Sequence, residues 1–160
     1  AIVTAPTKKL IVNVGEFDKA FAMNSKKYKK SPGEIYGNVG VIPVGANVKV
    51  VGGVPNGYDQ EDWISADMYG WSKVKYDGKI GWVPTHELVF ENPYSWAPGI
   101  KDVTLNEIKK RYIDSKDTIK LVEGDVYNGI GSLTLYTQIG GVGQWYYLVT
   151  INPKTGWWHG

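Results

Sequence analysis

The sequence predicts a mainly β protein that is built around a duplicated hairpin and carries one or two short helices. Three observations favour this class. The 160 residues include 20 glycines, which suit tight turns. They also include 11 tyrosines and 7 tryptophans against 3 phenylalanines, and such aromatic residues are common in strands. Finally, a strand–turn–strand motif in the middle of the chain recurs near the C-terminus.

The first copy of this motif runs from Tyr69 to Pro84. Apolar side chains recur through its first half, and Asp77-Gly78 is a two-residue turn signal, because both turn positions need positive φ. Ile80–Val83 is the expected return strand. Pro84 has no backbone N–H to donate, so it ends the pairing or marks a sheet edge.

The second copy, at residues 146–157, aligns without a gap with residues 71–82, which lie 75 positions earlier. A Gly-Trp pair ends both aligned segments. Asn152-Pro153 stands in place of Asp77-Gly78, which predicts a turn of a different type. An internal repeat of this kind indicates that one structural unit is present twice.

These residues resemble the bacterial SH3 (SH3b) modules of phage endolysins and bacterial autolysins, and are similar to the GW modules of Gram-positive surface proteins. The shared features are an aromatic residue, a Lys-Val-x-Tyr strand, a glycine turn and a Gly-Trp-Val return strand, clearest over residues 44–88. The resemblance implies two SH3b-like small β-barrels in tandem. Residues 1–92 would form the first module with an N-terminal extension, 93–103 a linker, and 104–160 a shorter second module.

Before the first copy, four segments carry local signals. The predicted elements are a strand at Leu10–Val14, a short helix at Glu16–Met23, a solvated basic loop at Lys26–Lys30 and a strand at Val44–Val51. The helix is expected because Phe17, Ala20 and Phe21 recur at helical spacing. The basic run could alternatively contact a polyanion.

After the first copy, Asn92–Gly99 holds two prolines and a glycine, which are typical of a linker, although Tyr94 and Trp96 indicate that it packs on something. Thr104 and Glu107 have capping-box spacing, which predicts a helix over 104–114. The remaining predicted strands are Ile119–Val122, Leu133–Gln138, and the second hairpin at Trp145–Ile151 and Thr155–His159.

The composition favours a binding protein over an enzyme. With no cysteine, disulfides, thiolate metal sites and a cysteine nucleophile are excluded. His86-Glu87 lacks the second histidine of a zinc-hydrolase motif, and no G-x-S-x-G motif is present. Glu61-Asp62 reads as solvated surface or, alternatively, as a calcium site. The net charge of +2 and the lack of a long apolar run favour neither nucleic acid nor membrane as partner, and no cofactor is expected.

The candidate ligand-binding side chains are aromatic and basic. Trp82 and Trp157 are expected inside the barrels, and Trp158 should then face outward, because neighbouring strand residues point to opposite faces. An exposed indole suits stacking on a sugar ring, and the alternative for each aromatic is packing in a core or between modules. The candidates are Trp145, Tyr147, Trp158, His159, Lys154, Trp71, Trp63, Tyr58 and Lys79.

The resemblance implies a non-catalytic domain that targets a phage endolysin or autolysin to Gram-positive bacteria by binding wall teichoic acid sugars or peptidoglycan. We expect a monomer that acts at the cell wall and, if phage-encoded, is made in the host cytoplasm and released at lysis. Two binding copies could raise avidity for a repetitive polymer. The alternatives are a small peptidoglycan hydrolase fragment and a barrel that binds single-stranded nucleic acid.

Overall fold

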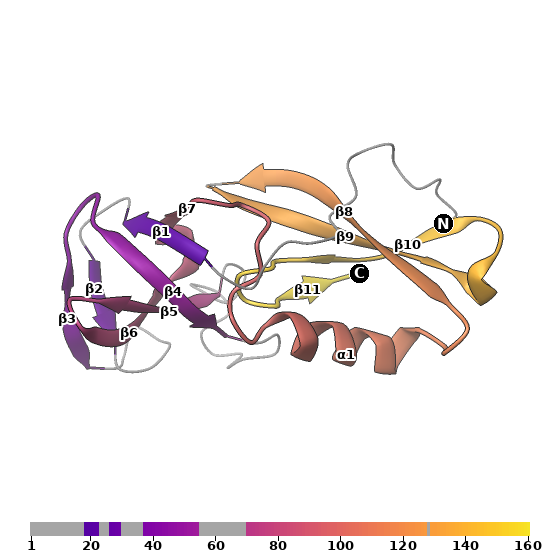
Figure 1. Cartoon of the computed structure of the whole chain (residues 1–160), viewed down its shortest axis with the longest axis horizontal. Helices are drawn as coiled ribbons and strands as arrows, with labels where there is room; N and C mark the ends of the chain where they lie inside the picture. The colour runs from indigo at the N-terminus through magenta and orange to yellow at the C-terminus, as the bar shows by residue number, and fades with distance from the viewer. Residues whose placement is uncertain (1–17, 23–25, 30–36, 55–69, 128) are drawn as a thin grey trace.

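The computed structural model describes residues 18–22, 26–29, 37–54, 70–127 and 129–160. These residues form two antiparallel sheets and one α-helix, and the helix is too short and too polar to cross a membrane. Figure 1 shows the two sheets next to each other along the long axis of the molecule. The predicted mainly β class is therefore confirmed.

The first sheet has seven strands in the spatial order β3-β2-β6-β5-β4-β1-β7. Its elements in chain order are β1 (Asp18–Ala22), β2 (Lys26–Lys29), β3 (Asn38–Ile42), β4 (Asn47–Gly53), β5 (Trp71–Tyr76), β6 (Lys79–Pro84), the 3₁₀ helix η2 (Thr85–Glu87) and β7 (Leu88–Phe90). Asp77 and Gly78 have φ of 49° and 72°. The predicted two-residue turn between β5 and β6 is therefore confirmed.

Two expectations for the N-terminal part of this sheet are wrong. The segment predicted as a helix at Glu16–Met23 contains β1, in which Ala20 and Ala22 are both buried. β1 pairs with β4 on one edge and β7 on the other, and these ladders override the helical spacing. The segment predicted as a loop at Lys26–Lys30 contains β2, whose Tyr28 is buried. The strand predicted at Leu10–Val14 lies outside the described residues.

The second sheet is a four-stranded meander in the order β11-β10-β9-β8. Its elements are β8 (Thr118–Tyr127), β9 (Ile130–Gln138), the 3₁₀ helix η3 (Ile139–Gly141), β10 (Trp145–Ile151) and β11 (Trp158–His159). The strands predicted at 119–122 and 133–138 are confirmed and are longer than expected. Neither sheet closes into a barrel among the described residues, so the tandem barrels expected from the repeat are not seen there. In the C-terminal part, a helix covers one face instead of further strands.

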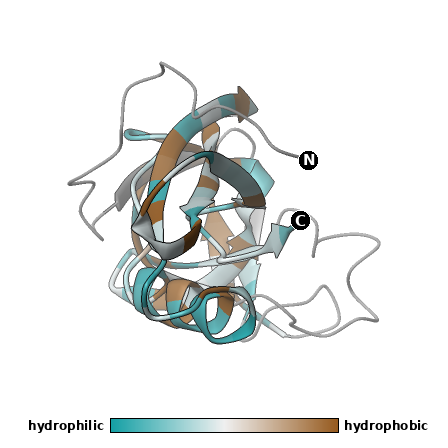
Figure 2. Cartoon of the chain, turned by 90° about the vertical axis from the view of Figure 1, so that its right-hand side faces the viewer, coloured by the Kyte–Doolittle hydropathy of each residue, from teal (hydrophilic) through white to brown (hydrophobic). Residues whose placement is uncertain are grey.

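That helix, α1 (Lys101–Tyr112), begins three residues before the predicted start at Thr104. Ile100 is its N-cap, and Thr104 is buried within the helix rather than capping it. Ile108 is fully buried and Leu105 nearly so, which fixes the face that contacts the sheet. The end-on view in Figure 2 shows α1 against one side of the strands.

One hydrophobic core joins both sheets, the helix and the segment between them. It includes Val50 and Val74 of the first sheet, Leu135 of the second and Ile108 of α1. The connecting segment contributes Trp96, which is 1% exposed, so the predicted linker packs as expected. The two sheets therefore share one packed core.

Candidate functional site

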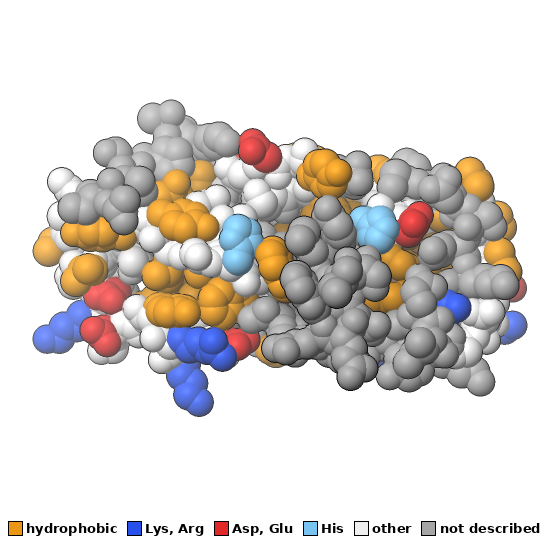
Figure 3. Space-filling view, turned by 180° about the vertical axis from the view of Figure 1, so that it is seen from behind, with side chains coloured by type: hydrophobic (Ala, Val, Ile, Leu, Met, Phe, Trp, Pro, Cys, Tyr) orange, Lys and Arg blue, Asp and Glu red, His pale blue; other side chains and the backbone are white. Residues whose placement is uncertain are grey.

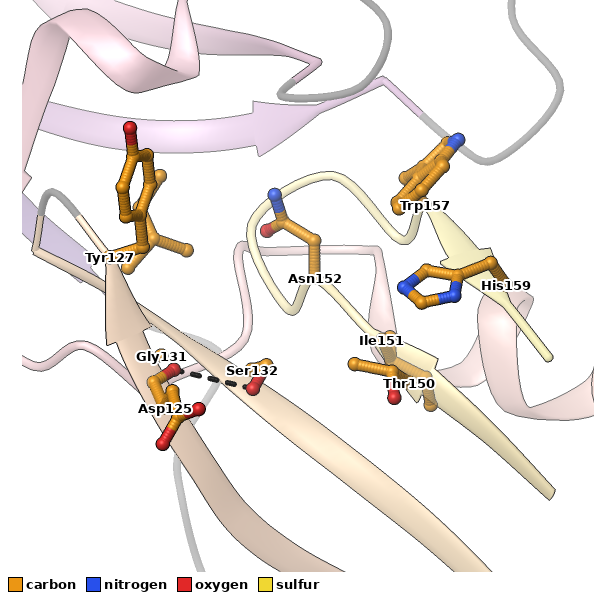
Figure 4. Close-up of a pocket in the computed structure, with 10 residues that line it drawn as sticks. Asp125, Tyr127, Gly131, Ser132, Thr150, Ile151, Asn152, Trp157 and His159 are labelled. Carbon is orange, nitrogen blue, oxygen red and sulfur yellow. Dashed lines mark hydrogen bonds between the residues drawn. The ribbon is translucent and has the colours of Figure 1, made fainter. Parts of the chain in front are cut away.

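A pocket of about 230 Å³ lies on the four-stranded sheet, next to the turn that leads into β11. Its lining comes from all four strands of that sheet or the segments beside them (Figure 4). The lining residues are Asp125, Tyr127, Ile130, Gly131, Ser132, Thr150, Ile151, Asn152, Trp157 and His159.

Strand register brings together the two segments that line the pocket, residues 125–132 and residues 150–159. β8 pairs with β9 through Tyr127 and Ile130, so the adjoining ends of both strands reach the pocket. β10 pairs with β11 through Thr150 and His159, which lie on one face of the sheet. The pocket is therefore a product of the meander and not of one local motif.

Three rings dominate the walls of the pocket. The rings of Trp157 and His159 lie with centroids 4.9 Å apart, tilted by 44°. Tyr127 stands on the opposite side, with Asn152 between it and Trp157 (Figure 4). Tyr127 is 64% exposed, so most of its side-chain surface faces solvent. Two facing aromatic walls suit a flat ligand with apolar faces.

The polar groups of the pocket are few and mostly uncharged. Asp125 supplies the carboxylate, and the lining residues include neither lysine nor arginine. The Ser132 hydroxyl donates to the backbone carbonyl of Asp125 at 3.3 Å, and the Asn152 side-chain oxygen accepts the Lys154 backbone N–H at 2.9 Å. Viewed from behind, the charged side chains of the described residues lie mainly towards the edges of the molecule (Figure 3).

The wall formed by β8 and β9 is held by Tyr94 of the connecting segment. The Tyr94 hydroxyl donates to the Gly124 carbonyl at 2.7 Å, and the Gly131 N–H donates to the Pro93 carbonyl at 2.9 Å. A Cβ at Gly131 would overlap the Tyr94 ring, so this position requires glycine. Burial, followed by the charges of Glu123 and Asp125, raises the pKa of Tyr94 above its usual value of 10.0.

The opposite wall is held by Lys154. We predicted that this residue contacts a ligand, but its side chain is fully buried and cannot reach one. Its ammonium donates to the carbonyls of Asn92 and Ser95, each at 2.7 Å, and to the Ser95 hydroxyl oxygen at 2.8 Å. It also lies 4.6 Å from the centre of the Phe90 ring. These contacts anchor the turn before Trp157 to the end of the first sheet.

The predicted inside–outside contrast between Trp157 and Trp158 is not seen, because both side chains are half-buried. Trp158 pairs with Ile151, a core residue, and packs edge-on against Tyr112 of α1 with centroids 5.8 Å apart. Arg111 lies 5.7 Å from its ring. Trp157 instead lines the pocket. The gapless alignment placed residues 152–157 opposite the tight turn and the return strand of the first hairpin, but they form a long turn, so β11 begins only at Trp158.

Trp145 and Tyr147 belong to a second aromatic group on β10, near the other end of the strand. The Lys120 ammonium lies 4.4 Å from the Trp145 ring. Tyr147 packs edge-on against Tyr136 with centroids 6.3 Å apart, and its hydroxyl shares a 2.8 Å hydrogen bond with Thr150. Neither aromatic lines the pocket, although Tyr147 reaches its edge through Thr150.

The candidates in the first sheet are not brought together with the pocket. Trp71 is 1% exposed and packs with Val54 and the half-buried Trp82, so it belongs to a small core of its own. Lys79 is exposed beside the tight turn of the first hairpin. Tyr58 and Trp63 lie outside the described residues.

Sequence reasoning missed most of the pocket, including Asp125, Tyr127, Ser132, Thr150 and Asn152. One signal was present in the sequence: Asn-Gly at positions 128–129, directly after Tyr127, is a dipeptide typical of two-residue hairpin turns. That turn would have indicated long strands on both sides and placed Tyr127 at a sheet end. Among the described residues, no group of three or more His, Asp or Glu side chains is arranged to hold a metal ion.

Comparison with known proteins gives one match. Residues 29–89 match the family model of the bacterial SH3 domain. This segment covers β3 to β6 and nearly all of β7, and it ends before the connecting segment. No curated protein and no solved structure matches the chain. The pocket at residues 125–159 therefore lies outside the matched segment.

Proposed function

We propose that this chain, whose residues 29–89 match the family model of the bacterial SH3 domain, is a non-catalytic module that binds a polymer of the bacterial cell wall. The observation that carries the proposal is the match itself, since bacterial SH3 domains commonly bind such polymers. The aromatic pocket beside this domain gives the chain a concave surface suited to a ligand.

The proposal extends to the ligand and the setting. The polymer is a wall teichoic acid sugar or peptidoglycan of a Gram-positive bacterium, and the module delivers a lytic enzyme, such as a phage endolysin or an autolysin, to it. Binding is by stacking and hydrogen bonds, with no bond broken. The chain acts as a monomer at the wall. A net charge of only +2 supports a mode in which charge attraction is secondary.

A wall-binding assay tests this function. The 160-residue chain, fused to a fluorescent protein, is mixed with purified Gram-positive walls, and the bound fraction is measured after sedimentation. We expect saturable binding, decoration of intact Gram-positive cells, and no binding by the fluorescent protein alone. Failure to bind walls from any of several Gram-positive genera would contradict the proposal.

The same incubation tests whether the module is catalytic. Supernatants are assayed for new reducing ends and new amines released from the walls. We expect neither above the level of walls alone. Release that depends on the chain would favour a hydrolase and would overturn the non-catalytic part of the proposal.

A further inference from the structure

We propose that the pocket at residues 125–159 binds one uncharged sugar ring, with Trp157 as the platform on which the ring stacks. This inference depends on the proposed function, because it names the part of the wall polymer that the chain holds. It also assigns a binding site outside the segment that matches the bacterial SH3 domain.

The size of the pocket sets the size of the ligand. Pockets for drug-sized ligands measure about 300–1,000 Å³. At about 230 Å³, this pocket is smaller than that range. It therefore suits a single six-membered sugar ring of a longer polymer, with the neighbouring units outside.

The aromatic walls set the shape of the ligand. The faces of a sugar ring carry C–H groups that gain from leaving water, while its hydroxyls point outward around the edge. Trp157 and His159 form one wall and Tyr127 the other. Ser132, Thr150 and Asn152 also line the pocket, and their hydroxyl and amide groups can pair with the edge of such a ring.

The charge of the pocket disfavours a phosphate as ligand. A phosphate of a teichoic acid backbone would need cationic partners, and the lining residues include neither lysine nor arginine. Asp125 would repel a phosphate. A single carboxylate on the rim accepts hydrogen bonds from sugar hydroxyls, so an uncharged ring fits the whole set of groups.

The platform is held in place before a ligand arrives. Trp157 follows a turn that Lys154 anchors to Asn92 and Ser95, and the Asn152 N–H donates to the Trp157 carbonyl at 2.8 Å. A fixed platform loses little conformational freedom when it binds, which favours affinity from a small contact.

The first test uses soluble sugars and nuclear magnetic resonance of the whole chain. The probes are glucose, galactose, N-acetylglucosamine and the β-1,4 tetramer of N-acetylglucosamine, with glycerol phosphate as the charged comparison. We expect at least one sugar to shift the Trp157 indole signal and signals around the pocket. No shift with any sugar, or a shift only with glycerol phosphate, overturns the inference.

The second test removes the walls of the pocket. Trp157→Ala and Tyr127→Ala are each expected to weaken binding to purified walls by about tenfold or more. Trp145→Ala is the matched control, because Trp145 lies on β10 outside the pocket, and it should bind like the parent. Tyr127 is exposed, so its variant keeps the test valid if Trp157→Ala does not fold. Loss in Trp145→Ala alone overturns the inference.

The third test reads the charge of the ligand. Asp125→Asn should leave wall binding unchanged or weaken it if the ring is uncharged, because the carboxylate accepts hydrogen bonds from the ring hydroxyls. A gain of about tenfold would indicate an anionic ligand and overturns the inference.

Further comparisons identify the polymer that carries the sugar, and they distinguish failure of the pocket inference from failure of the proposed function. The chain still binds walls stripped of teichoic acid if the ring belongs to the glycan strand of peptidoglycan. It no longer binds them if the ring decorates the teichoic acid. If the parent binds walls but the pocket variants bind equally well, the inference fails and the proposed function stands. If the parent chain binds no wall, the proposed function fails. The titration with soluble sugars then still tests whether the pocket binds a sugar ring.

Discussion

At the scale of single residues, Lys154 has a structural role that the sequence does not reveal. The alignment placed it opposite Lys79, an exposed residue beside a tight turn, so it read as a ligand contact. In the fold it is fully buried and donates three hydrogen bonds across the junction between the sheets. A buried ammonium is tolerated only where such partners replace water.

Replacing Lys154 by methionine keeps the length of the side chain and removes the donors. The carbonyls of Asn92 and Ser95 would lose this partner, so we expect a loss of roughly 1–3 kcal/mol in the free energy of unfolding. Urea unfolding followed by circular dichroism measures it. Lys79→Met is the control and should shift the free energy by less than about 0.5 kcal/mol. Equal effects of the two substitutions would show that the anchor contributes nothing.

Two tyrosines, Tyr28 and Tyr94, make the free energy of unfolding depend on pH in the alkaline range. Burial, with smaller effects of Asp77 and Tyr76, raises the pKa of Tyr28, and burial also raises the pKa of Tyr94. In the unfolded chain both titrate near pH 10. The folded state therefore holds these protons more tightly, and the resulting stability is complete below about pH 10 and is lost as the pH rises through the raised values.

The expected result is a free energy of unfolding that falls above about pH 10. The fall should be shallower in the double variant Tyr28→Phe/Tyr94→Phe, whatever its stability at neutral pH. Urea midpoints measured from neutral to strongly alkaline pH provide the comparison. An unchanged dependence in the double variant would mean that these two groups do not carry the effect.

At the scale of elements, local signals predicted the first hairpin and α1, and failed where pairing partners are distant. Asp77-Gly78 sets its own turn, and Leu105 and Ile108 mark a helix face without outside help. β1 became a strand only because β4 and β7 flank it. The pocket depends on the register between β10 and β11, which the long turn at 152–157 sets.

Gly156 tests the importance of this turn. Its φ is 76°, and a Cβ there would overlap the Thr104 hydroxyl of α1. Gly156→Ala should therefore lower the free energy of unfolding by about 2–4 kcal/mol and weaken wall binding, because Trp157 moves. Gly140→Ala is the matched control: its φ is 65°, nothing lies within 4 Å of its Cβ, and it should cost only about 1 kcal/mol. Thermal unfolding compares the two, and a larger loss in Gly140→Ala would contradict the packing role.

At the scale of the whole molecule, the two similar segments of the sequence have different architectures. Both copies contain a hairpin, yet the second hairpin joins a meander that α1 covers. The domain boundaries at 1–92, 93–103 and 104–160 stay a prediction. The core itself runs from the first sheet through Trp96 to the second sheet. Sequence periodicity does not report such contacts, because it describes the faces of single elements.

A continuous core predicts cooperative unfolding. Urea transitions followed by near-ultraviolet and far-ultraviolet circular dichroism should coincide, with one midpoint. Hydrogen exchange should show similar protection in β5 and β9, which lie in different sheets. Two separated transitions would show that the sheets are independent units despite the shared core.

The most direct measurement of the central claim is the binding of the whole chain to purified walls as salt is raised from about 0.1 M to about 1 M. Over this range the screening length falls from about 10 Å to about 3 Å, which weakens contacts between exposed charges. Stacking of an uncharged ring on Trp157 predicts binding that is present throughout and changes by less than about threefold. Absence of binding, or a fall of about a hundredfold as expected for several phosphate contacts, would contradict it.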